Sequence, residues 1–284
     1  MLRLPDFLII GGMRCGTTSL HELLRMQPAL YFPENKESHF FDRRNPDLGV
    51  SIERYMDLFS DCPAESFCGE ATPDYLTTEG CDELIHSVLP EAKLIVILRD
   101  PVERTWSHYL FSVLNKVETM GFQSALDAEA ERLTVKSDHT DIFFSYLQRS
   151  RYIEHLERFE SLFGNDRLKI VFFEDLVKKP QQVLMQLLDF LDVSFIDEFV
   201  ELPHLNEMSK LYEESIPKEP VQTSRLSRLM VRLSGKTDQE PKYKKVECKK
   251  EELADSDREY LQSYFSEYNA KLEKYVDRPL PWPY

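Results

Sequence analysis

The sequence predicts an α/β protein in which a parallel β-sheet is flanked by helices. Three short apolar runs, at residues 7–10, 94–98 and 168–173, are expected to form buried strands. Their apolar residues follow one another without alternation, which is typical of parallel strands covered on both faces. Amphipathic helical patterns lie between and after these runs, and a glycine-rich turn follows the first one. Strands that alternate with helices favour a doubly wound layer structure.

The first half of the chain supplies two expected helices and a weaker strand candidate. One helix is expected at residues 18–26, directly after the glycine-rich turn, and residues 67–70 are the strand candidate. A second helix is expected to begin at Asp100 and Pro101, because an N-cap aspartate followed by proline at the first helical position is a good start signal.

The second half carries three helical patterns and one polar stretch. Residues 146–163 place Tyr152, Leu156, Phe159 and Phe163 at spacings of 4, 3 and 4, and residues 183–191 and 261–275 each carry a similar apolar stripe. Residues 217–250 are polar and contain five lysines between 242 and 250. They fit a solvated loop, and they also fit a mobile basic flap over an anionic ligand.

Composition bounds the class of protein. The 284 residues are expected to form a single domain over 1–284, and the net charge of −15 argues against a nucleic-acid binder. The five cysteines form no C-x-x-C pair, so neither a disulfide framework nor a zinc or other metal site is expected, and a reducing compartment is favoured. The apolar run at residues 7–10 is too short for a signal or membrane segment. We therefore expect a cytoplasmic protein without a membrane partner.

The glycine-rich turn at residues 11–19 is the strongest local signal. It follows an expected strand and opens an expected helix, where backbone N–H groups and the helix dipole favour an anion. Gly11 and Gly16 have the spacing of a phosphate-binding P-loop. A nucleotide triphosphatase has lysine after the second glycine, but Thr17 stands there and the cation is Arg14. The turn is therefore badly suited to triphosphate and Mg²⁺. A tight turn that needs glycine only for its dihedral angles is the alternative.

Two further segments carry candidate site residues. Arg99 follows the strand at 94–98, and Ser107 lies in the next helix, so both could hold a terminal phosphate. An ordinary ion pair of Arg99 is equally compatible with the residues alone. In the segment 34–42, extended backbone would place Glu37 and His39 on one face and Lys36 and Ser38 on the other, which indicates a candidate base; a surface loop with ordinary ion pairs is the alternative.

The motifs together resemble the family of sulfotransferases that use 3'-phosphoadenosine-5'-phosphosulfate (PAPS), including heparan-type and bacterial members. Residues 7–20 resemble the family's 5'-phosphosulfate loop, and R-D-P-x-x-R-x-x-S-x-Y from Arg99 to Tyr109 resembles its 3'-phosphate motif. The segments around 172–191 and 264–282 also match, so the resemblance covers nearly the whole chain. It implies a P-loop-containing sheet with a sulfotransferase-like, nucleotide-kinase-like topology.

The resemblance also implies site residues. The segment Glu37-Ser-His39-Phe-Phe is similar to the heparan-type motif whose glutamate is the general base, with His39 supporting it, and Arg14 is implied as the cation at the reaction centre. PAPS is the implied donor and PAP the product, without a metal. The implied donor-binding residues are Arg14, Cys15, Gly16, Thr17, Thr18, Ser19, Arg99 and Ser107.

The acceptor and the rival functions remain open. Residues 69–75 resemble a family motif with lysine where Ala71 stands, which argues against a heparan-like acceptor. A small-molecule, carrier-bound or carbohydrate acceptor is compatible with the sequence, and the first two are preferred because the chain is strongly acidic. The rivals are a P-loop kinase, which would need lysine at position 17 and an acid such as Asp100 for its metal, and a non-catalytic nucleotide-binding protein.

Overall fold

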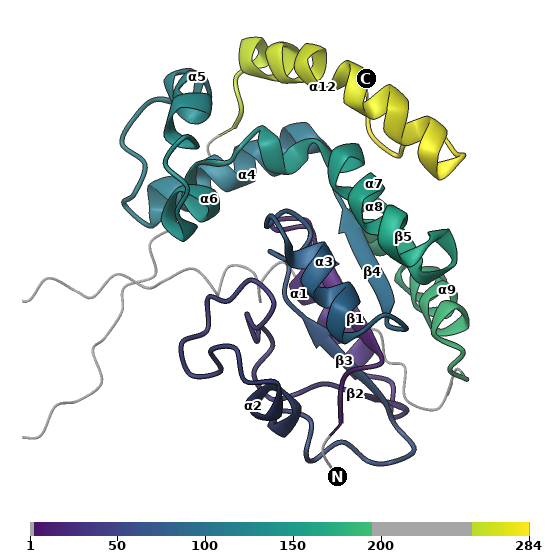
Figure 1. Ribbon diagram of the computed structural model, residues 1–284. Coiled ribbons are helices and arrows are strands. Elements are labelled where there is room, and N and C mark those ends of the chain that lie inside the picture. Colours follow the sequence, from purple (N-terminus) through teal and green to yellow (C-terminus); the bar gives the residue numbers. More distant parts are fainter. Residues whose placement is uncertain (1–2, 195–251, 284) are drawn as a thin grey trace, which may run out of the picture. The chain divides into compact units, whose positions relative to one another are not determined.

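The structure is a computed structural model that describes residues 3–194 and 252–283 (Figure 1). Within these residues the strands form one parallel five-stranded sheet in the order β2-β3-β1-β4-β5. The strands are β1 (Phe7–Gly11), β2 (Leu30–Tyr31), β3 (Phe67–Ala71), β4 (Lys93–Leu98) and β5 (Leu168–Phe172). The expected α/β class and all four expected strands are confirmed.

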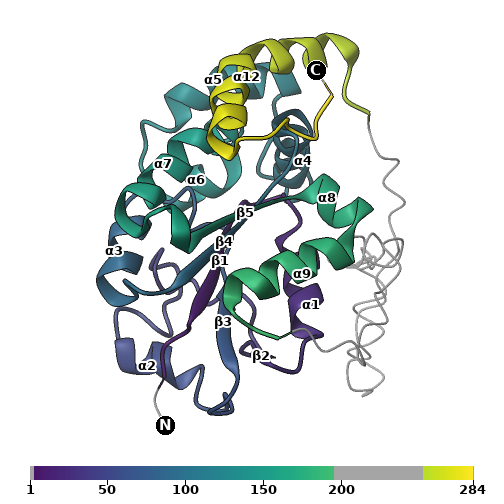
Figure 2. The ribbon, with the colours of Figure 1, turned by 90° about the vertical axis from the view of Figure 1, so that its right-hand side faces the viewer.

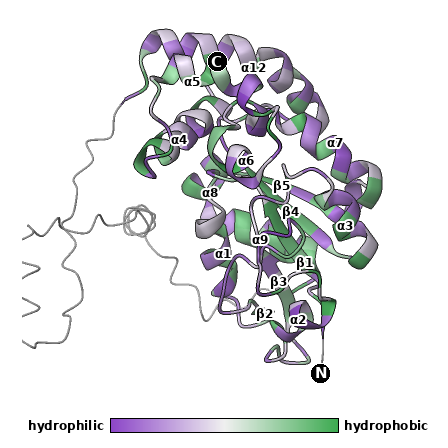
Figure 3. Ribbon diagram, turned by 60° about the vertical axis from the view of Figure 1, so that its left-hand side comes forward, coloured by the Kyte–Doolittle hydropathy of each residue, from purple (hydrophilic) through white to green (hydrophobic). Residues whose placement is uncertain are grey.

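The sheet forms the centre of the core. All five residues of β1 and five of the six residues of β4 are buried. Burial on both faces explains why these strands read as continuous apolar runs. In Figure 3 the strands are accordingly coloured as hydrophobic, whereas the surrounding helices alternate between hydrophobic and hydrophilic residues.

Helices cover both faces of the sheet. In Figure 2, α1 and α9 lie on one side of the strands, and α3 and α7 lie on the other. The longer helices are α1 (Thr17–Arg25), α3 (Cys81–Val88), α4 (Pro101–Leu114), α5 (Phe122–Arg132), α7 (Tyr152–Phe163), α9 (Pro180–Leu191) and α12 (Asp255–Val276). The shorter ones are α2 (Ile52–Asp57), α6 (Asp138–Phe144), α8 (Phe173–Lys178) and the 3-10 turns η1 (Gln148–Ser150) and η2 (Asn165–Arg167).

The start of α4 confirms the expected start signal. Asp100 Oδ1 accepts a hydrogen bond of 2.9 Å from the N–H of Val102, and Pro101 occupies the first helical position. Asp100 is thereby used as a helix cap. Because the cap fixes the direction in which α4 leaves the sheet, it also fixes where the α4 side chains stand relative to the end of β4.

The expected helix at 146–163 is wrong at its beginning. Residues 148–150 form the separate turn η1, and the helix α7 begins only after Arg151, whose φ of −82° and ψ of 59° interrupt it. The backbone before this point bonds elsewhere: Glu129 of α5 accepts from the N–H groups of Leu147 and Gln148, and Arg104 of α4 donates to the carbonyl of Tyr146. Tertiary hydrogen bonds therefore replace the first helical turn.

Two expectations concern the chain as a whole. Residues 3–194 and 255–283 lie in one compact unit, but the expected single domain over 1–284 stays a prediction, because the stretch 217–250 lies outside the described residues. Among the described helices, none combines the length and the apolar character that crossing a membrane requires.

Candidate active site

The loop between β1 and α1 has the geometry of an anion site. Gly16 caps α1 with a left-handed φ of 94°, and within the described residues no side chain bonds to the free N–H groups at this helix start. The N–H of Gly12 donates to the carbonyl of Ile97 at 2.8 Å, which ties the loop to β4. The helix start is thus fixed at the carboxyl edge of the sheet, where an anion would meet backbone donors.

The Phe173 ring explains why position 16 requires glycine. A Cβ built at Gly16 would lie 2.5 Å from the Phe173 ring, and its positive φ also disfavours other residues. The guanidinium of Arg99 lies over the same ring, 5.3 Å from its centre. Sequence reasoning assigned Phe173 to a strand, but β5 ends at Phe172 and Phe173 begins α8. The sequence signal for a role of Phe173 in the site was its position directly after a strand, since ligands bind at the carboxyl ends of the strands in such sheets.

Arg14 joins the loop to α4. Its Nε donates a 3.1 Å hydrogen bond to Ser107 Oγ, and its guanidinium lies 5.2 Å from the centre of the Phe111 ring. Burial, followed by the charges of Arg99 and Arg104, lowers the pKa of Arg14 to about 10. Arg14 therefore stays charged at neutral pH, but next to other cations. An anion placed among these arginines would relieve their repulsion.

Arg99 completes the convergence of the two motifs. It follows β4, the direct neighbour of β1, and its Nη1 donates to the carbonyl oxygen of Arg14 at 3.5 Å. The motifs are 85 residues apart in sequence. The structure thus brings together Arg14, Arg99 and Ser107 beside the loop that contains Cys15, Gly16, Thr17, Thr18 and Ser19. Arg104 does not join them, since it is buried and donates to Ser150 and Tyr146.

Glu37 and His39 are in contact, but not by the expected backbone geometry. His39 Nε2 lies 3.5 Å from Glu37 Oε2, and His39 Nδ1 lies 2.7 Å from Asp42 Oδ2. His39 has a φ of 51°, so the segment is not extended there. Lys36, expected on the opposite face, forms a 2.6 Å ion pair with Glu37. The left-handed residue turns the chain back toward Asp42, which sequence reasoning did not select.

The charges of this group are unequal. Hydrogen bonds to Asp42 and then to Glu37 raise the pKa of His39 to about 10, so the imidazole is protonated at neutral pH. Burial opposes ionisation of Glu37, but the hydrogen bond from His39 and the charge of Lys36 outweigh it and lower its pKa. The Glu37 side chain is 38% exposed. Of these two groups, Glu37 is therefore the one that can accept a proton at neutral pH.

A buried carboxylate holds this segment in place. Glu70 of β3 accepts hydrogen bonds from the backbone and hydroxyl of Ser38 at 3.4 and 3.1 Å, and from the hydroxyl of Thr72. Tyr75 accepts a hydrogen bond from the N–H of Phe40 at 3.1 Å. Burial raises the pKa of Glu70 to about 7. Residues on both sides of Ala71 thus fix the backbone on which Glu37 and His39 stand.

Among the described residues, one group of side chains has the spacing of metal ligands, and arginines already pair with its carboxylates. His39, Asp42 and Asp74 place ligand atoms within 4.8 Å of one another. Arg149 Nη1 lies 2.5 Å from Asp74, and Arg44 Nη1 lies 3.3 Å from Asp74 and 3.6 Å from Asp42. Two cations already neutralise these carboxylates, so the group fits a charge network better than a metal site.

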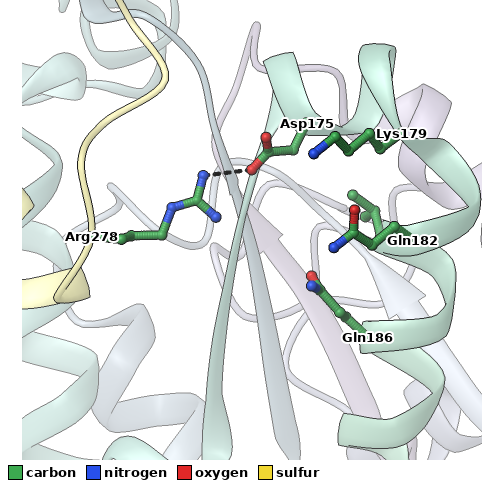
Figure 4. A pocket seen from close by; sticks show the side chains of 6 residues that line it. Asp175, Lys179, Gln182, Gln186 and Arg278 are labelled. Carbon is green, nitrogen blue, oxygen red and sulfur yellow. Dashed lines mark hydrogen bonds and ion pairs between the residues drawn. The ribbon is translucent and has the colours of Figure 1, made fainter.

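A polar cavity of the described residues lies elsewhere. It has a volume of about 280 Å³ and lies between α8, α9 and the segment after α12 (Figure 4). Its lining residues are Asp175, Lys179, Gln182, Val183, Gln186 and Arg278. Figure 4 shows Arg278 paired with Asp175. None of the residues selected from the sequence lines it, so the candidate site rests on the convergence at the sheet edge.

Comparison with known proteins identifies the family. The family model for the sulfotransferase domain matches residues 4–275. The chain belongs to the sulfotransferase family. The sequence-based assignment to this family and to its enzyme class is therefore confirmed.

Individual sulfotransferases support this assignment over the whole chain. A crystal structure of a sulfotransferase from Alicyclobacillus acidocaldarius has 26% identity and a TM-score of 0.72 and covers 98% of both chains. The bifunctional heparan sulfate N-deacetylase/N-sulfotransferase 4 of Mus musculus is 30% identical over 98% of this chain, which spans 31% of that protein. The membrane-associated sulfotransferase kil1 of Dictyostelium discoideum is 23% identical over 99% of this chain and 67% of its own length. Because that relative is named as membrane-associated, the cytoplasmic location stays a prediction.

Proposed function

We propose that this sulfotransferase domain transfers a sulfuryl group from PAPS to a hydroxyl or amine of an acceptor and releases PAP. The observation that carries the proposal is the convergence of Arg14, Arg99 and Ser107 beside the start of α1, where Gly16 provides no side-chain cap. Two arginines and a row of backbone donors suit a ligand with two separate phosphate groups. They require no metal to balance its charge.

In this proposal the loop binds the 5'-phosphosulfate and the β4 edge binds the 3'-phosphate. Residues 15–19 present backbone donors and hydroxyls to the 5'-phosphate, and Arg14 faces the bridging oxygen that becomes negative as the S–O bond breaks. Arg99 and Ser107 hold the 3'-phosphate by charge-assisted hydrogen bonds. Arg14 is hydrogen-bonded to Ser107, so the residues proposed to bind the two ends of the donor are in direct contact with each other.

Glu37 is the proposed general base. The acceptor oxygen attacks sulfur in line with the leaving phosphate, a new S–O bond forms as the old one breaks, and the acceptor proton passes to Glu37. His39 is protonated and bonded to both Glu37 and Asp42, so it supports Glu37 and does not compete for the proton. Glu70 and Thr72 fix the segment from below.

The rival functions find less support. A P-loop kinase would use Lys at position 17 and Asp100 for its metal, but Thr17 stands at that position and Asp100 caps α4. A non-catalytic role would not require a protonated histidine that orients a carboxylate. We also propose a small hydroxylated metabolite or a carrier-bound intermediate as the acceptor, since Ala71 replaces a cation and the net charge is −15. Carbohydrate remains the alternative, because several relatives act on heparan sulfate according to their names.

Three measurements test the proposal. Calorimetry should detect PAP binding in the presence of a metal chelator, and incubation with ATP and Mg²⁺ should give no phosphoryl transfer. A screen of phenols, alcohols, amines, carrier-bound hydroxyl compounds and oligosaccharides with ³⁵S-labelled PAPS should label at least one class. Absence of PAP binding would contradict the donor assignment, and labelling of heparan-type oligosaccharides alone would contradict the acceptor preference.

A further inference from the structure

Glu103 on α4 is shared by two arginines from distant parts of the chain. Its Oε2 lies 3.7 Å from Arg99 Nη2, and its Oε1 lies 2.9 Å from Arg258 Nη1 on the first turn of α12. The side chains of Arg99, Glu103 and Arg258 are 22%, 35% and 35% exposed. The Glu103 carboxylate thus lies between Arg99, which is proposed to bind the 3'-phosphate, and Arg258, which belongs to none of the motifs found in the sequence.

The surroundings of Arg99 are acidic. Glu174 accepts a hydrogen bond from the N–H of Asp100 at 3.1 Å, and Glu103 lies one helical turn after Arg99. Burial, together with the charges of Glu103 and Glu174, raises the pKa of Asp100 to about 6, and Arg258 acts in the opposite direction. A phosphate brought to Arg99 would therefore meet carboxylates at close range, where like charges repel.

Geometry separates the two contacts of Glu103. Both contacts are ion pairs, but Glu103 lies 2.9 Å from Arg258 and 3.7 Å from Arg99, so the pair with Arg258 is the closer one. The Glu103 carboxylate is therefore held mainly by Arg258 of α12 and interacts more weakly with Arg99. The planar fork of Arg99 consequently keeps donors that can turn to a ligand.

We propose that Arg258 is a positioning residue for donor binding: it binds and neutralises Glu103 so that Arg99 can hold the 3'-phosphate of PAPS. The inference rests on the proposed function, because it assumes that Arg99 contacts this phosphate. Arg258 acts through Glu103 and does not touch the ligand. α12 thereby takes part in the donor site from the far end of the chain.

The interaction predicts a specific pattern of binding constants. PAP and adenosine 5'-phosphate differ by the 3'-phosphate, so calorimetry with both ligands isolates this group. Arg258→Ala should weaken PAP binding by about fivefold, the size expected when one partly exposed ion pair is lost, and should leave adenosine 5'-phosphate binding unchanged. Glu103→Gln alone should leave PAP binding unchanged or tighter. The double variant should recover the PAP affinity of Glu103→Gln, because no charge remains to be neutralised.

Arg278→Ala is the matched control. Arg278 follows the same helix, and its guanidinium lies 2.6 Å from the Asp175 carboxylate. Figure 4 shows this pair, so removal of Arg278 takes away one positive charge without touching Glu103. PAP affinity should not change in this variant. Thermal unfolding should verify that each variant is folded, and Arg258→Lys, which keeps the charge, should retain most of the affinity if Arg258→Ala does not fold.

The possible failures are distinguishable. A loss of PAP affinity in Arg258→Ala that Glu103→Gln does not rescue would show that Arg258 contacts the phosphate directly and would overturn the positioning role. An equal loss for adenosine 5'-phosphate, or no loss at all, would also overturn it. Arg99→Ala is measured in the same series: if it leaves PAP affinity unchanged, the 3'-phosphate assignment itself is wrong and the inference falls with it.

Discussion

Arg14 Nε donates a hydrogen bond of 3.1 Å to Ser107 Oγ, which joins the loop after β1 to the helix after β4 at the sheet edge. The order of the sheet produces this contact, because β1 and β4 are neighbours and their carboxyl ends open at the same edge. The cation proposed for the leaving phosphate and the hydroxyl proposed for the 3'-phosphate are thereby coupled.

The first prediction concerns Arg14. Its pKa is lowered by burial and by the charges of the neighbouring Arg99 and Arg104, so negative charge that develops beside these arginines in the transition state is stabilised. Arg14→Ala should lower kcat by about 10²-fold or more, the size expected for the loss of one preorganised electrostatic stabiliser. Arg14→Lys should recover part of the rate. Steady-state kinetics with PAPS and an active acceptor provide the measurement.

Arg25 is the control for this prediction. It is the last residue of α1, which follows the loop that contains Arg14, but its side chain is 47% exposed and lies 3.5 Å from Glu22. Arg25→Ala should leave kcat unchanged. An Arg14 variant that raised KM and left kcat intact would contradict the role, because it would show uniform binding of ground state and transition state.

The second prediction concerns Arg99. Removal of a guanidinium that makes charge-assisted hydrogen bonds to a phosphate should weaken PAP binding by roughly 2–4 kcal/mol. Calorimetry on Arg99→Ala checks this. Arg167 is a suitable control, since it lies in η2 before β5 and pairs with Glu91. Equal affinity of wild type and Arg99→Ala for PAP would remove Arg99 from the donor site.

The sequence predicted the centre of the fold because burial on both faces leaves a plain signal. It did not predict β2, which has two residues, or α6, which has seven residues and none of them buried. Elements this short are stabilised by their contacts and carry too little periodicity to be read.

The site likewise contains residues that the sequence predicted and residues that it did not. Arg14, Arg99 and Ser107 follow strands or lie on the next helix, so topology alone brings them together. Asp42, Glu103 and Arg258 acquire their roles through tertiary contacts. The left-handed turn at His39 and the docking of α12 against α4 and α7 create these contacts, and neither has a local sequence signal.

The third prediction concerns the pH dependence of stability. The pKa of Glu70 is raised to about 7 in the folded protein, above the ordinary 4.5, so folding favours its protonated form. This contribution to stability is complete below pH 4.5 and is lost as the pH rises through 7. Glu70→Gln resembles the protonated form. The decrease in unfolding free energy between pH 5 and 8, measured in urea, should be smaller in this variant by roughly 1–3 kcal/mol.

Glu65 supplies the comparison for Glu70. It is an exposed glutamate in a loop, and Glu65→Gln should keep the pH dependence of the wild type. His39, whose pKa is raised to about 10, contributes stability that is complete below its ordinary value of 6.5 and is lost as the pH rises through 10. That contribution is common to all these variants. The same pH slope in Glu70→Gln and wild type would mean that Glu70 is ionised when buried.

The last prediction concerns Glu37 and its partner His39. A neutral hydroxyl is a poor nucleophile without a base, and Glu37 is the member of the pair that is unprotonated at neutral pH. Glu37→Gln should therefore leave PAP binding nearly normal and reduce turnover by about 10²–10⁴-fold, the range of general base catalysis. The kcat/KM profile should lose its acidic limb. His39→Gln should instead move that limb to higher pH, because the hydrogen bond that lowers the pKa of Glu37 is gone. This shift separates a supporting role from a merely structural one. An inactive His39 variant beside a Glu37→Gln enzyme that kept most of its rate would require the two roles to be exchanged.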